Sequence, residues 1–475
     1  MTWTLAGFIL YLVAILVVGF VTYRKNESEY DYFLAGRKLN PWVVAFSERA
    51  SGESAWLLLG LPGAALALGL IELWTAFGCV AGIVFYWYTI APRLRVRSAE
   101  LNSMTLPEFF ARHFTRGRGA IRITATFIIL FFFTFYLAAQ LNGAGKVLNV
   151  TFGIEPATGM FIGAAVILFY TMMGGFFAVA WTDFIQGAIM FGALVILPLA
   201  ALAELAGTGN SLQTAVGQAG DSFLSITGGK TGWAGIAAII GGLSWALGYM
   251  GQPHLLTRFM AIKDPERIRL SRRIAFVWAI PAFTGAVLIG LCGLALYGQG
   301  YFEDVEHVMP HLATAVLPSW LAGIFISGAI AAIMSTADSQ LLVASSAVAE
   351  DLCHRTLGIH FSPKGMLLFS RIITILVGVS AFLIALYSQK LIFAMVSYAW
   401  AGLGSSFGPA LLLLLWWNKT TWQGVLAGMI AGTLTTILWS EITILDQTVT
   451  VRLMSFVFGL MAVWLASKLT QPRTA

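Results

Sequence analysis

The sequence is poor in charged residues and in cysteine. Charged side chains make up 11% of its 475 residues, whereas 58% of the residues are hydrophobic. Soluble domains carry about 25% charged residues, so this composition excludes an ordinary soluble protein. The three cysteines are widely spaced and predict neither a disulfide framework nor a transition-metal site. There is no HExxH motif, and we expect no enzyme activity.

Long apolar runs dominate the sequence instead. Segments of about 20 apolar residues, the length that crosses about 30 Å of hydrocarbon, recur from one end of the chain to the other, and the mean hydropathy is +0.82. The short alternating segments of a membrane β-barrel do not occur. We therefore predict an all-α polytopic membrane protein with about thirteen transmembrane helices. The predicted spans are 3–22, 42–69, 72–92, 122–148, 157–180, 183–204, 233–258, 273–297, 319–349, 366–387, 390–417, 420–440 and 449–468.

The charges of the connecting loops predict how the chain is oriented. Under this span count, clusters of basic residues lie on one side of the membrane, and the loop Tyr301–Ser319, which is acidic and has no Lys or Arg, lies on the other. The positive-inside rule then places the N-terminus outside and the C-terminus in the cytoplasm. We expect a multi-pass protein of the plasma membrane, the inner membrane in a bacterium, with an uncleaved first span. The basic residues are Arg24, Lys25, Arg37, Lys38, Arg93, Arg95, Arg97, Arg112, Arg116, Arg118, Arg122, Arg258, Lys263, Arg267, Arg269, Arg272 and Arg273.

Two apolar stretches are interrupted by small and polar residues. Ser47–Gly63 reads SERASGESAWLLLGLPG, and Trp245–Pro253 reads WALGYMGQP. We expect both helices to break there. Freed backbone N–H and C=O groups are tolerated in a bilayer only where they are buried in protein or line a cavity. Two such breaks in matching halves of a chain are typical of secondary transporters, whose binding sites they form.

The two breaks also divide the chain into blocks. With the first span set aside, each break opens a block of five spans, 42–204 and 233–417. Because five is odd, the blocks have opposite orientations in the membrane, which is the inverted repeat of many secondary transporters. Residues 1–41 then form a first transmembrane helix and a cytoplasmic loop. Residues 418–475 form two C-terminal helices and a short cytoplasmic tail.

Small and hydroxyl-bearing residues share one face of the ninth span. Ala332, Ser335, Thr336 and Ser339 are spaced i, i+3, i+4 and i+7, and Asp338 stands beside them. Hydroxyls, carboxylates and freed carbonyls are the oxygen ligands that a cation such as Na⁺ needs. Ser and Thr in membrane helices often only bond to the preceding turn. A carboxylate near midspan, however, is costly to bury without a function, so we favour cation binding.

Other charged residues leave alternatives open. Asp183 is either a second acidic cation ligand facing Ser339 or a helix cap. Glu48 and Arg49 form either a gate or a pair of charges that extend to the inner interface, and we favour the second. Glu53 lies deeper, where its carboxylate could meet a cation or a substrate amine, and its freed carbonyl oxygen is a ligand in either case.

The second break carries an aromatic stripe. Trp245, Tyr249 and Pro253 are spaced i, i+4 and i+8 beside two glycines. Such stripes usually pack or form interfacial belts, but glycines beside one open space for a small, partly apolar solute. His254, next to the stripe, could relay protons, although we favour a hydrogen-bonded structural role.

Motifs along nearly the whole chain carry a resemblance to a known family. They are Gly36–Trp42 (GRKLNPW), Ser54–Gly63 (SAWLLLGLPG), Thr105–Phe109 (TLPEF), Gly174–Asp183 (GGFFAVAWTD), Leu247–His254 (LGYMGQPH), Met334–Thr336 (MST), Gln340–Val343 (QLLV), Ser345–Ala347 (SSA) and Glu350–Leu352 (EDL). The sequence resembles the sodium/solute symporter family, and within it the sodium/proline symporters. This resemblance implies a LeuT-like five-plus-five inverted repeat with extra helices, and Na⁺-driven uptake.

The resemblance also implies site residues. The main sodium site falls on the carbonyls of Ala50, Glu53 and Ala332 and the hydroxyls of Ser335 and Thr336. A second cation site falls on Asp183, Ser335 and Ser339, with Asp338 adjacent. The substrate-contacting positions fall on Gly52, Ser54, Ala55, Trp56, Trp245, Tyr249 and Pro253, and Tyr136 matches a tyrosine implicated in the family's cycle. Gly52 stands where proline symporters carry an essential aspartate, so either Glu53 replaces that charge or the substrate differs.

We therefore expect a sodium-coupled symporter that imports a small organic solute by alternating access, with L-proline as the first candidate and no bound cofactor. The expected partners are the solute, Na⁺ and the lipid bilayer, and no nucleic acid. The alternatives are another amino acid or a small carboxylate as solute, coupling to H⁺, and a membrane sensor that binds solute without transporting it.

Overall fold

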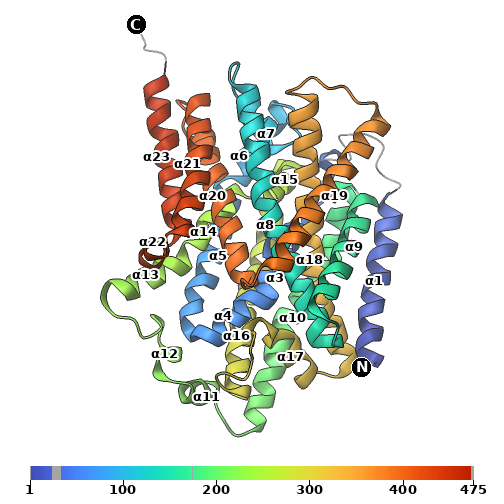
Figure 1. Cartoon of the computed structure of the whole chain (residues 1–475), viewed down its shortest axis with the longest axis vertical. Helices are drawn as coiled ribbons and strands as arrows, with labels where there is room; N and C mark the ends of the chain where they lie inside the picture. Colours follow the sequence, from blue (N-terminus) through green and yellow to red (C-terminus); the bar gives the residue numbers. More distant parts are fainter. Residues whose placement is uncertain (1, 24–33, 174, 472–475) are drawn as a thin grey trace.

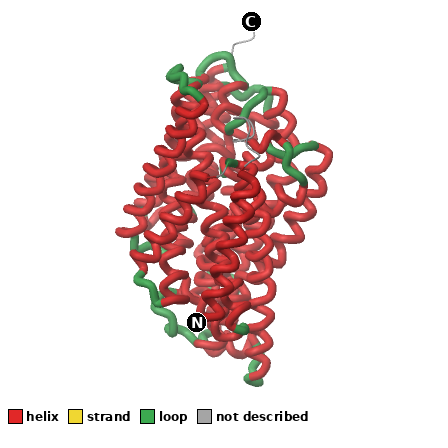
Figure 2. The backbone as a smooth tube through the Cα atoms, turned by 90° about the vertical axis from the view of Figure 1, so that its right-hand side faces the viewer, coloured by secondary structure: helices red, strands yellow, loops and turns green. Residues whose placement is uncertain are grey.

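The structure, a computed structural model, describes residues 2–23, 34–173 and 175–471, and its regular elements in these ranges are all helices. Arg24, Lys25 and Gly174, which the sequence analysis used, lie outside the described residues. The helices run roughly along the long axis of the molecule, and most loops lie at its two ends (Figure 2). The chain is thus a helical bundle of the kind that spans a membrane.

Within the described residues, the first part of the chain forms twelve helices labelled α (Figure 1) and three short 3-10 or π-helical segments labelled η. The elements are α1 (Thr2–Tyr23), η1 (Ala35–Arg37), α3 (Pro41–Ala55), η2 (Trp56–Gly60), α4 (Leu61–Leu68), η3 (Gly69–Glu72), α5 (Leu73–Thr89), α6 (Ala91–Glu100), α7 (Leu106–Arg112), α8 (Arg118–Phe152), α9 (Pro156–Met173), α10 (Phe176–Gly207), α11 (Leu212–Gln218), α12 (Asp221–Leu224) and α13 (Gly232–Leu243).

The second part begins at the second break. Its elements are α14 (Trp245–Gly248), η4 (Tyr249–Gly251), α15 (Pro253–Met260), η5 (Pro265–Arg267), α16 (Ile268–Tyr297), η6 (Val305–His307), α17 (Val308–Val316), α18 (Ser319–Ser346), η7 (Ala347–His354), α19 (Pro363–Tyr387), α20 (Ile392–Trp416), α21 (Trp422–Glu441), α22 (Thr443–Thr448) and α23 (Val451–Thr470). Helix α1 begins at one end of the molecule and α23 ends at the other (Figure 1).

The number of membrane spans is not fixed by these helices. Within the described residues, ten helical runs are long and apolar enough to cross a membrane, and α1 and α9 contain shorter apolar stretches. One of the ten, Pro41–Thr89, includes α3, α4 and α5 and turns at Gly69, whose φ is 76°. The thirteen spans expected from the sequence therefore stay a prediction. Helices α6, α7, α11 and α17 lie in segments that the sequence analysis assigned to loops.

Both expected helix breaks are present. In α3 the backbone leaves helical geometry at Ser54, where φ is 39° and ψ is −166°. A π-helical turn, Trp56–Gly60, follows before α4 begins. In the second stretch, Gln252 is extended, with φ −80° and ψ 107°, between η4 and α15, and Pro253 is the first residue of α15. Proline suits that position because the first N–H of a helix has no intrahelical partner.

Helix α18 forms the centre of the bundle. It packs against α1, α3, α8 and α10. The apolar stretch of the helical run Ser319–His354 is 83% buried within the molecule, compared with 28% for those in α19 and α23. Helices α19 and α23 therefore lie at the periphery, and the polar residues of α18 face other helices rather than lipid.

Two basic residues expected in loops are buried. Arg37 donates to the carbonyl oxygen of Met260 at 3.0 Å, and Arg95 Nε donates to that of Ile262 at 2.5 Å. These contacts attach η1 and α6 to the end of α15, so the two arginines cap a helix C-terminus, where cations are favourable.

Candidate functional site

The break in α3 faces the hydroxyl side chains of α18. Ser335 Oγ lies 3.1 Å from the carbonyl oxygens of both Ala50 and Ala332. Thr336 Oγ1 donates a hydrogen bond to the carbonyl oxygen of Ser51 at 2.9 Å. All five residues are fully buried. Hydroxyl and carbonyl oxygens from two helices therefore meet at one place, and such oxygens can coordinate a monovalent cation.

The fifth expected sodium ligand has a different partner. The carbonyl oxygen of Glu53 accepts the backbone N–H of Trp56, because the chain changes direction at Ser54 and starts a new turn there. The structure thus brings together Ala50, Ala332, Ser335 and Thr336 and adds the carbonyl of Ser51, which the sequence analysis did not select.

A guanidinium group occupies the middle of the expected second cation site. Arg258 Nη2 lies 2.7 Å from Asp183 Oδ2, 2.6 Å from Ser339 Oγ and 2.5 Å from Ser51 Oγ. Arg258 Nε donates to Ser47 Oγ at 2.8 Å, and Ser47 in turn donates to Asp183. The expected residues Asp183 and Ser339 do come together, and both surround a cation that belongs to the chain itself.

The placement of Arg258 corrects an interpretation of the sequence. It was counted among the basic residues of a cytoplasmic loop, but it is fully buried on α15. Helix α15 continues for eight residues from Pro253, so Arg258 lies one turn after His254 on the same face. His254 Nε2 lies 3.3 Å from the carbonyl oxygen of Ser51 and is a buried, hydrogen-bonded histidine.

Asp338 lies at the edge of this cluster. Its Oδ1 accepts a hydrogen bond from Ser339 Oγ at 3.3 Å, and its Oδ2 has no partner among the described residues. The side chain is fully buried. A buried carboxyl oxygen without a partner is costly, so Asp338 is a group beside the cluster that a bound cation could satisfy.

The aromatic residues of the two breaks form one wall. The rings of Trp56 and Trp245 stack with centroids 4.6 Å apart and an angle of 16° between planes. Trp56 Nε1 donates to the carbonyl oxygen of Gly52 at 3.4 Å. Tyr249 OH donates to Glu53 Oε2 at 3.1 Å. The expected substrate-contacting residues of both breaks are therefore neighbours, and they combine flat apolar surfaces with one carboxylate.

The charged residues of the first break form a buried cluster. Arg49 makes ion pairs with Glu48 and with Glu53, the second at 2.5 Å between Nη1 and Oε1. Tyr86 OH lies 2.7 Å from Arg49 Nη2, and Trp87 Nε1 donates to Glu48 at 3.2 Å. The interpretation that Glu48 and Arg49 extend to the membrane interface was wrong, because both are fully buried and satisfied by these partners.

Polar side chains of α8 form hydrogen bonds with the residues at the α3 break. Gln140 Oε1 accepts the backbone N–H of Ala55 at 3.1 Å, and its Nε2 donates to Ser54 Oγ at 3.3 Å. Tyr136 OH lies 3.4 Å from the same Ser54 oxygen. A side-chain amide thus replaces the helical hydrogen bond that the break removes. Gln140 was not selected from the sequence, where it is one of two amides, with Asn142, in the apolar span 122–148.

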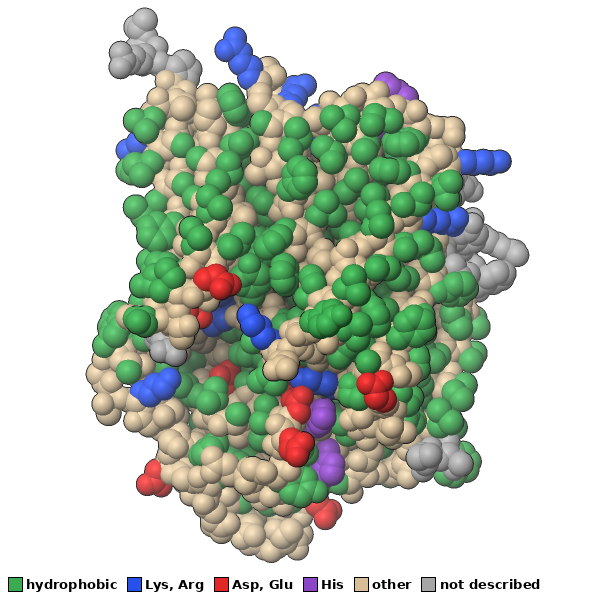
Figure 3. Space-filling view, in the orientation of Figure 1, with side chains coloured by type: hydrophobic (Ala, Val, Ile, Leu, Met, Phe, Trp, Pro, Cys, Tyr) green, Lys and Arg blue, Asp and Glu red, His purple; other side chains and the backbone are tan. Residues whose placement is uncertain are grey.

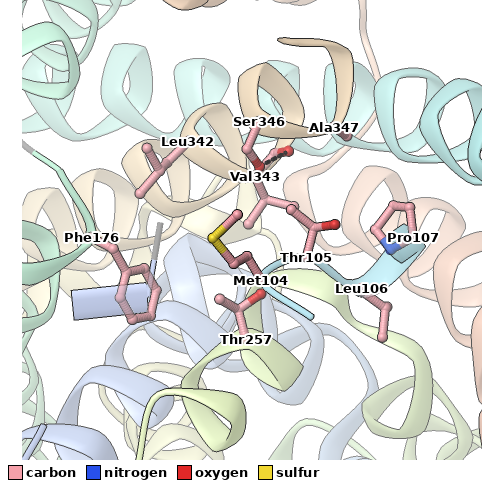
Figure 4. Close-up of a pocket in the computed structure, with 10 residues that line it drawn as sticks. All are labelled: Met104, Thr105, Leu106, Pro107, Phe176, Thr257, Leu342, Val343, Ser346 and Ala347. Atoms are coloured by element: carbon pink, nitrogen blue, oxygen red, sulfur yellow. Dashed lines mark hydrogen bonds between the residues drawn. The ribbon is translucent and has the colours of Figure 1, made fainter. Parts of the chain in front are cut away.

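The site is closed on the side of α7 and the beginning of α10. A cavity of only about 20 Å³ lies there, lined by residues that include Met104, Phe176, Thr257 and Leu342 (Figure 4). Phe176 also lies under Arg258, whose guanidinium carbon is 5.5 Å from the ring centroid. A cavity of this size holds about one water molecule, so no solute passes here in this conformation.

A comparison with known families decides what this site belongs to. The sequence model of the sodium:solute symporter family matches residues 32–432. The chain belongs to the sodium:solute symporter family. Two curated relatives are the sodium/proline symporter of Escherichia coli (strain K12), 37% identical over 92% of this chain and 88% of the relative, and the high-affinity proline transporter PutP of Bacillus subtilis (strain 168), 38% identical over 96% of each chain.

Solved structures show the fold of this symporter. A Na⁺-coupled sialic acid symporter in a substrate-bound outward-open state matches with a TM-score of 0.81 at 20% identity, over 99% of this chain and 98% of the other. MhsT in complex with L-phenylalanine matches with a TM-score of 0.58 at 13% identity, over 90% of this chain and 98% of the other. The symporter therefore has the expected all-helical, LeuT-like fold.

Proposed function

We propose that this symporter imports a small organic solute together with Na⁺, that L-proline is the first candidate for the solute, and that Ala50, Ser51, Ala332, Ser335 and Thr336 hold the ion. The observation that carries the proposal is the contact of Ser335 and Thr336 with carbonyl oxygens of the α3 break at 2.9–3.1 Å. These groups come from two helices that are far apart in sequence, so an ion between them would link the two halves of the chain.

We assign one Na⁺ to this site and none to the second. Arg258 supplies a permanent positive charge to Asp183 and Ser339 at 2.6–2.7 Å, and a guanidinium at that position leaves no need for a second alkali ion. Na⁺ is a transported co-substrate here, and no other cofactor is assigned.

The substrate assignment rests on the aromatic wall and on the relatives. Trp56, Trp245 and Tyr249 offer flat apolar surfaces to a small ring, and Arg49 and Glu53 can pair with the carboxylate and the ammonium group of an amino acid. The two relatives described above are named for proline. Position 52 is a glycine, whereas proline symporters have an aspartate there. Another amino acid or a small carboxylate is therefore the second candidate.

Transport requires two blocks that move against each other. We propose residues 42–204 and 233–417 as the inverted repeats, with the N-terminus outside and the C-terminus in the cytoplasm of a bacterial inner membrane. The upper end of the molecule in Figure 3 displays Lys, Arg and His side chains and no acidic ones, whereas the acidic side chains of this face lie farther down, together with other Lys, Arg and His side chains. The positive-inside rule supports the upper end as the cytoplasmic one.

The test is uptake of labelled L-proline into proteoliposomes. An inward Na⁺ gradient should drive accumulation in the wild type, and the variant Ser335→Ala/Thr336→Ala should lose this stimulation. The matched control is Ser327→Ala/Ser345→Ala, which removes two hydroxyls of the same helix whose hydrogen bonds, within the described residues, go to carbonyl oxygens of that helix. Intact sodium-driven uptake in the first variant would count against the site.

The same preparation separates the alternatives. Competition by other amino acids and by small carboxylates identifies the solute. A pH gradient without Na⁺ tests coupling to H⁺. Solute binding without any uptake would identify a sensor rather than a transporter.

A further inference from the structure

Four arginines line a cavity away from the transport site. The cavity has a volume of about 400 Å³ and is lined by Glu100, Leu101, Arg112, Arg118, Arg122 and Arg355. They come from four segments: the end of α6, α7, the start of α8 and the residues after η7. These segments lie at the end of the molecule where α23 ends (Figure 1). We call this feature the arginine cavity.

Two of the four arginines have carboxylate partners. Arg112 Nε donates to Glu108 Oε1 at 2.8 Å, and Arg355 Nε donates to Glu350 Oε1 at 2.6 Å. Glu100, the one acid in the lining, pairs with Arg97 at 3.2 Å. Glu100, Glu108 and Glu350 therefore already have arginine partners, whereas Asp351 accepts a hydrogen bond from Thr105 at 2.9 Å.

The other two arginines are not neutralised in this way. Among the described residues, neither Arg118 nor Arg122 has a carboxylate within 4.0 Å. Arg122 is only 9% exposed, its Nε has no hydrogen-bond partner in the described part of the chain, and its Nη1 reaches only the carbonyl of Arg355, at 3.4 Å. Arg118 is exposed and donates to the carbonyl of Phe114 at 2.5 Å.

The charge balance of the cluster is positive. Four guanidinium groups line the cavity. The charge of Glu100 in the lining is balanced by Arg97, which lies outside the lining. Three further carboxylates lie beside the four arginines, those of Glu108, Glu350 and Asp351. All three acids are fully buried. One positive charge is therefore left over, and it lies on the side that faces the cavity.

We propose that the arginine cavity binds the phosphate group of an anion, and that the anion is a phospholipid headgroup or a soluble phosphate. The planar guanidinium matches phosphate oxygens through two parallel hydrogen bonds, which would satisfy the free Nε of Arg122. A volume of 400 Å³ lies in the range of small-molecule sites. Basic pockets between membrane helices bind anionic headgroups. Phe127, which is 60% exposed and lies on the same helix as Arg118 and Arg122, offers an apolar surface to an acyl chain.

The experiment uses the full-length protein purified in detergent. Its thermal stability is measured with added phosphatidylglycerol, with phosphatidylcholine of the same acyl chains, and with inorganic phosphate. Phosphatidylglycerol should stabilise the wild type and phosphatidylcholine should not. In Arg118→Gln/Arg122→Gln the apparent affinity for phosphatidylglycerol should fall by about tenfold or more, because each charged hydrogen bond contributes substantially.

Further measurements distinguish a lipid headgroup from a soluble phosphate as the ligand, and control variants distinguish lost binding from a folding defect. The variant Arg267→Gln/Arg269→Gln removes two exposed arginines outside the cavity and should keep the wild-type response. Stabilisation by inorganic phosphate equal to that by the lipid would identify a soluble anion as the ligand. Arg118→Gln alone is the fallback, because Arg118 is exposed and bonds only a carbonyl. The proposal is overturned if neither anion stabilises the wild type, or if the cavity variants respond as the wild type does.

Discussion

Arg258 and Asp183 form a buried ion pair between α15 and α10, with 2.7 Å between Nη2 and Oδ2. The two residues are separated by 75 positions in the sequence. The same guanidinium also contacts Ser51 and Ser339. Because these groups come from α3, α10, α15 and α18, this one side chain links helices of both halves of the chain beside the proposed sodium site.

Removing one member of this pair should destabilise the protein more than removing both. A buried charge left without its partner costs about 3–5 kcal/mol, whereas replacing both partners is often close to neutral. We expect Asp183→Asn and Arg258→Gln each to lower the melting temperature in detergent, and Asp183→Asn/Arg258→Gln to recover part of the loss. If the decrease in melting temperature of the double variant equals the sum of the two single decreases, the two charges do not stabilise each other.

Glu53 should set the affinity for the solute. Glu53→Gln leaves Arg49 paired with Glu48, so the protein should fold. Because a hydrogen bond to a charged group contributes about 1.5–3 kcal/mol, the KM for proline should rise roughly 10- to 100-fold. Glu204→Gln, an exposed acid on α10, is the control and should leave KM unchanged.

A second substitution tests whether the charge of Glu53 replaces the aspartate that proline symporters have one position earlier. A Cβ added at Gly52 would lie 3.4 Å from Leu255 and 3.8 Å from Arg49 Nη2, which are ordinary contacts. We expect Gly52→Asp to recover much of the lost affinity in the Glu53→Gln background. No recovery, with normal folding, would mean that the carboxylate acts only from Glu53.

Close packing of α16 on α10 should make Gly285 intolerant of a side chain. A Cβ there would lie 1.7 Å from the backbone oxygen of Leu194, so α16 would have to move. Overpacking of this kind costs about 1–3 kcal/mol or more. We expect Gly285→Ala to lower the melting temperature by several degrees or to abolish expression.

Gly192→Ala is the matched control for this packing effect. It makes the same change on α10, where the nearest atom to the new Cβ is a Phe325 ring carbon at 3.5 Å. Helix propensity alone favours alanine over glycine by about 1 kcal/mol at either position. The change in melting temperature should therefore be negative for Gly285→Ala and positive for Gly192→Ala. Equal melting temperatures of the two variants would contradict close contact between these helices.

Local patterns in the sequence predicted the helical fold, the break in α3 and the hydroxyl face of α18 that meets it. The helical spacing of Ser335 and Thr336 placed both hydroxyls on one face, and the small and polar residues around Ser54 predicted the break that they contact. Each of these inferences depends on residues within a few helical turns, where sequence spacing fixes geometry. The hydroxyls and the break could therefore be found before any long-range contact was known. The carbonyls of Ala50, Glu53 and Ala332 were selected by the resemblance to the family, and the sodium site stays a prediction.

The burial of the charged residues could not be predicted in the same way. Whether Arg49 or Arg258 faces the cytoplasm or the protein interior depends on which acid lies opposite, and Asp183 lies opposite Arg258 only because α10 and α15 meet on α3. Spacing within one helix carries no information about that meeting. A basic side chain near the end of an apolar segment was therefore assigned to a loop, although a partner far away in sequence makes its burial possible.

The narrow cavity beside Arg258 should open during transport. Alternating access requires a path from the site to the cytoplasm, and Phe176, Met104 and Leu342 close the cavity next to Thr257 (Figure 4). Thr257 is 5% exposed. We expect Na⁺ binding to stabilise an outward-open state, in which this cavity stays closed. In a Cys353→Ser background, Thr257→Cys should therefore react slowly with an impermeant maleimide when Na⁺ is present. Reaction should be faster without Na⁺.

Loss of the Phe176 ring should favour the open form of this cavity. Phe176→Ala removes the largest side chain of the cavity lining and the surface under Arg258, so Thr257→Cys should then be labelled even in Na⁺, and from the cytoplasmic face of inside-out vesicles only. Leu357→Cys, at an exposed position of the same end, should be labelled equally in all conditions. Labelling of Thr257→Cys that changes neither with Na⁺ nor with Phe176→Ala would place the cytoplasmic path elsewhere, because these side chains could not then be the ones that move.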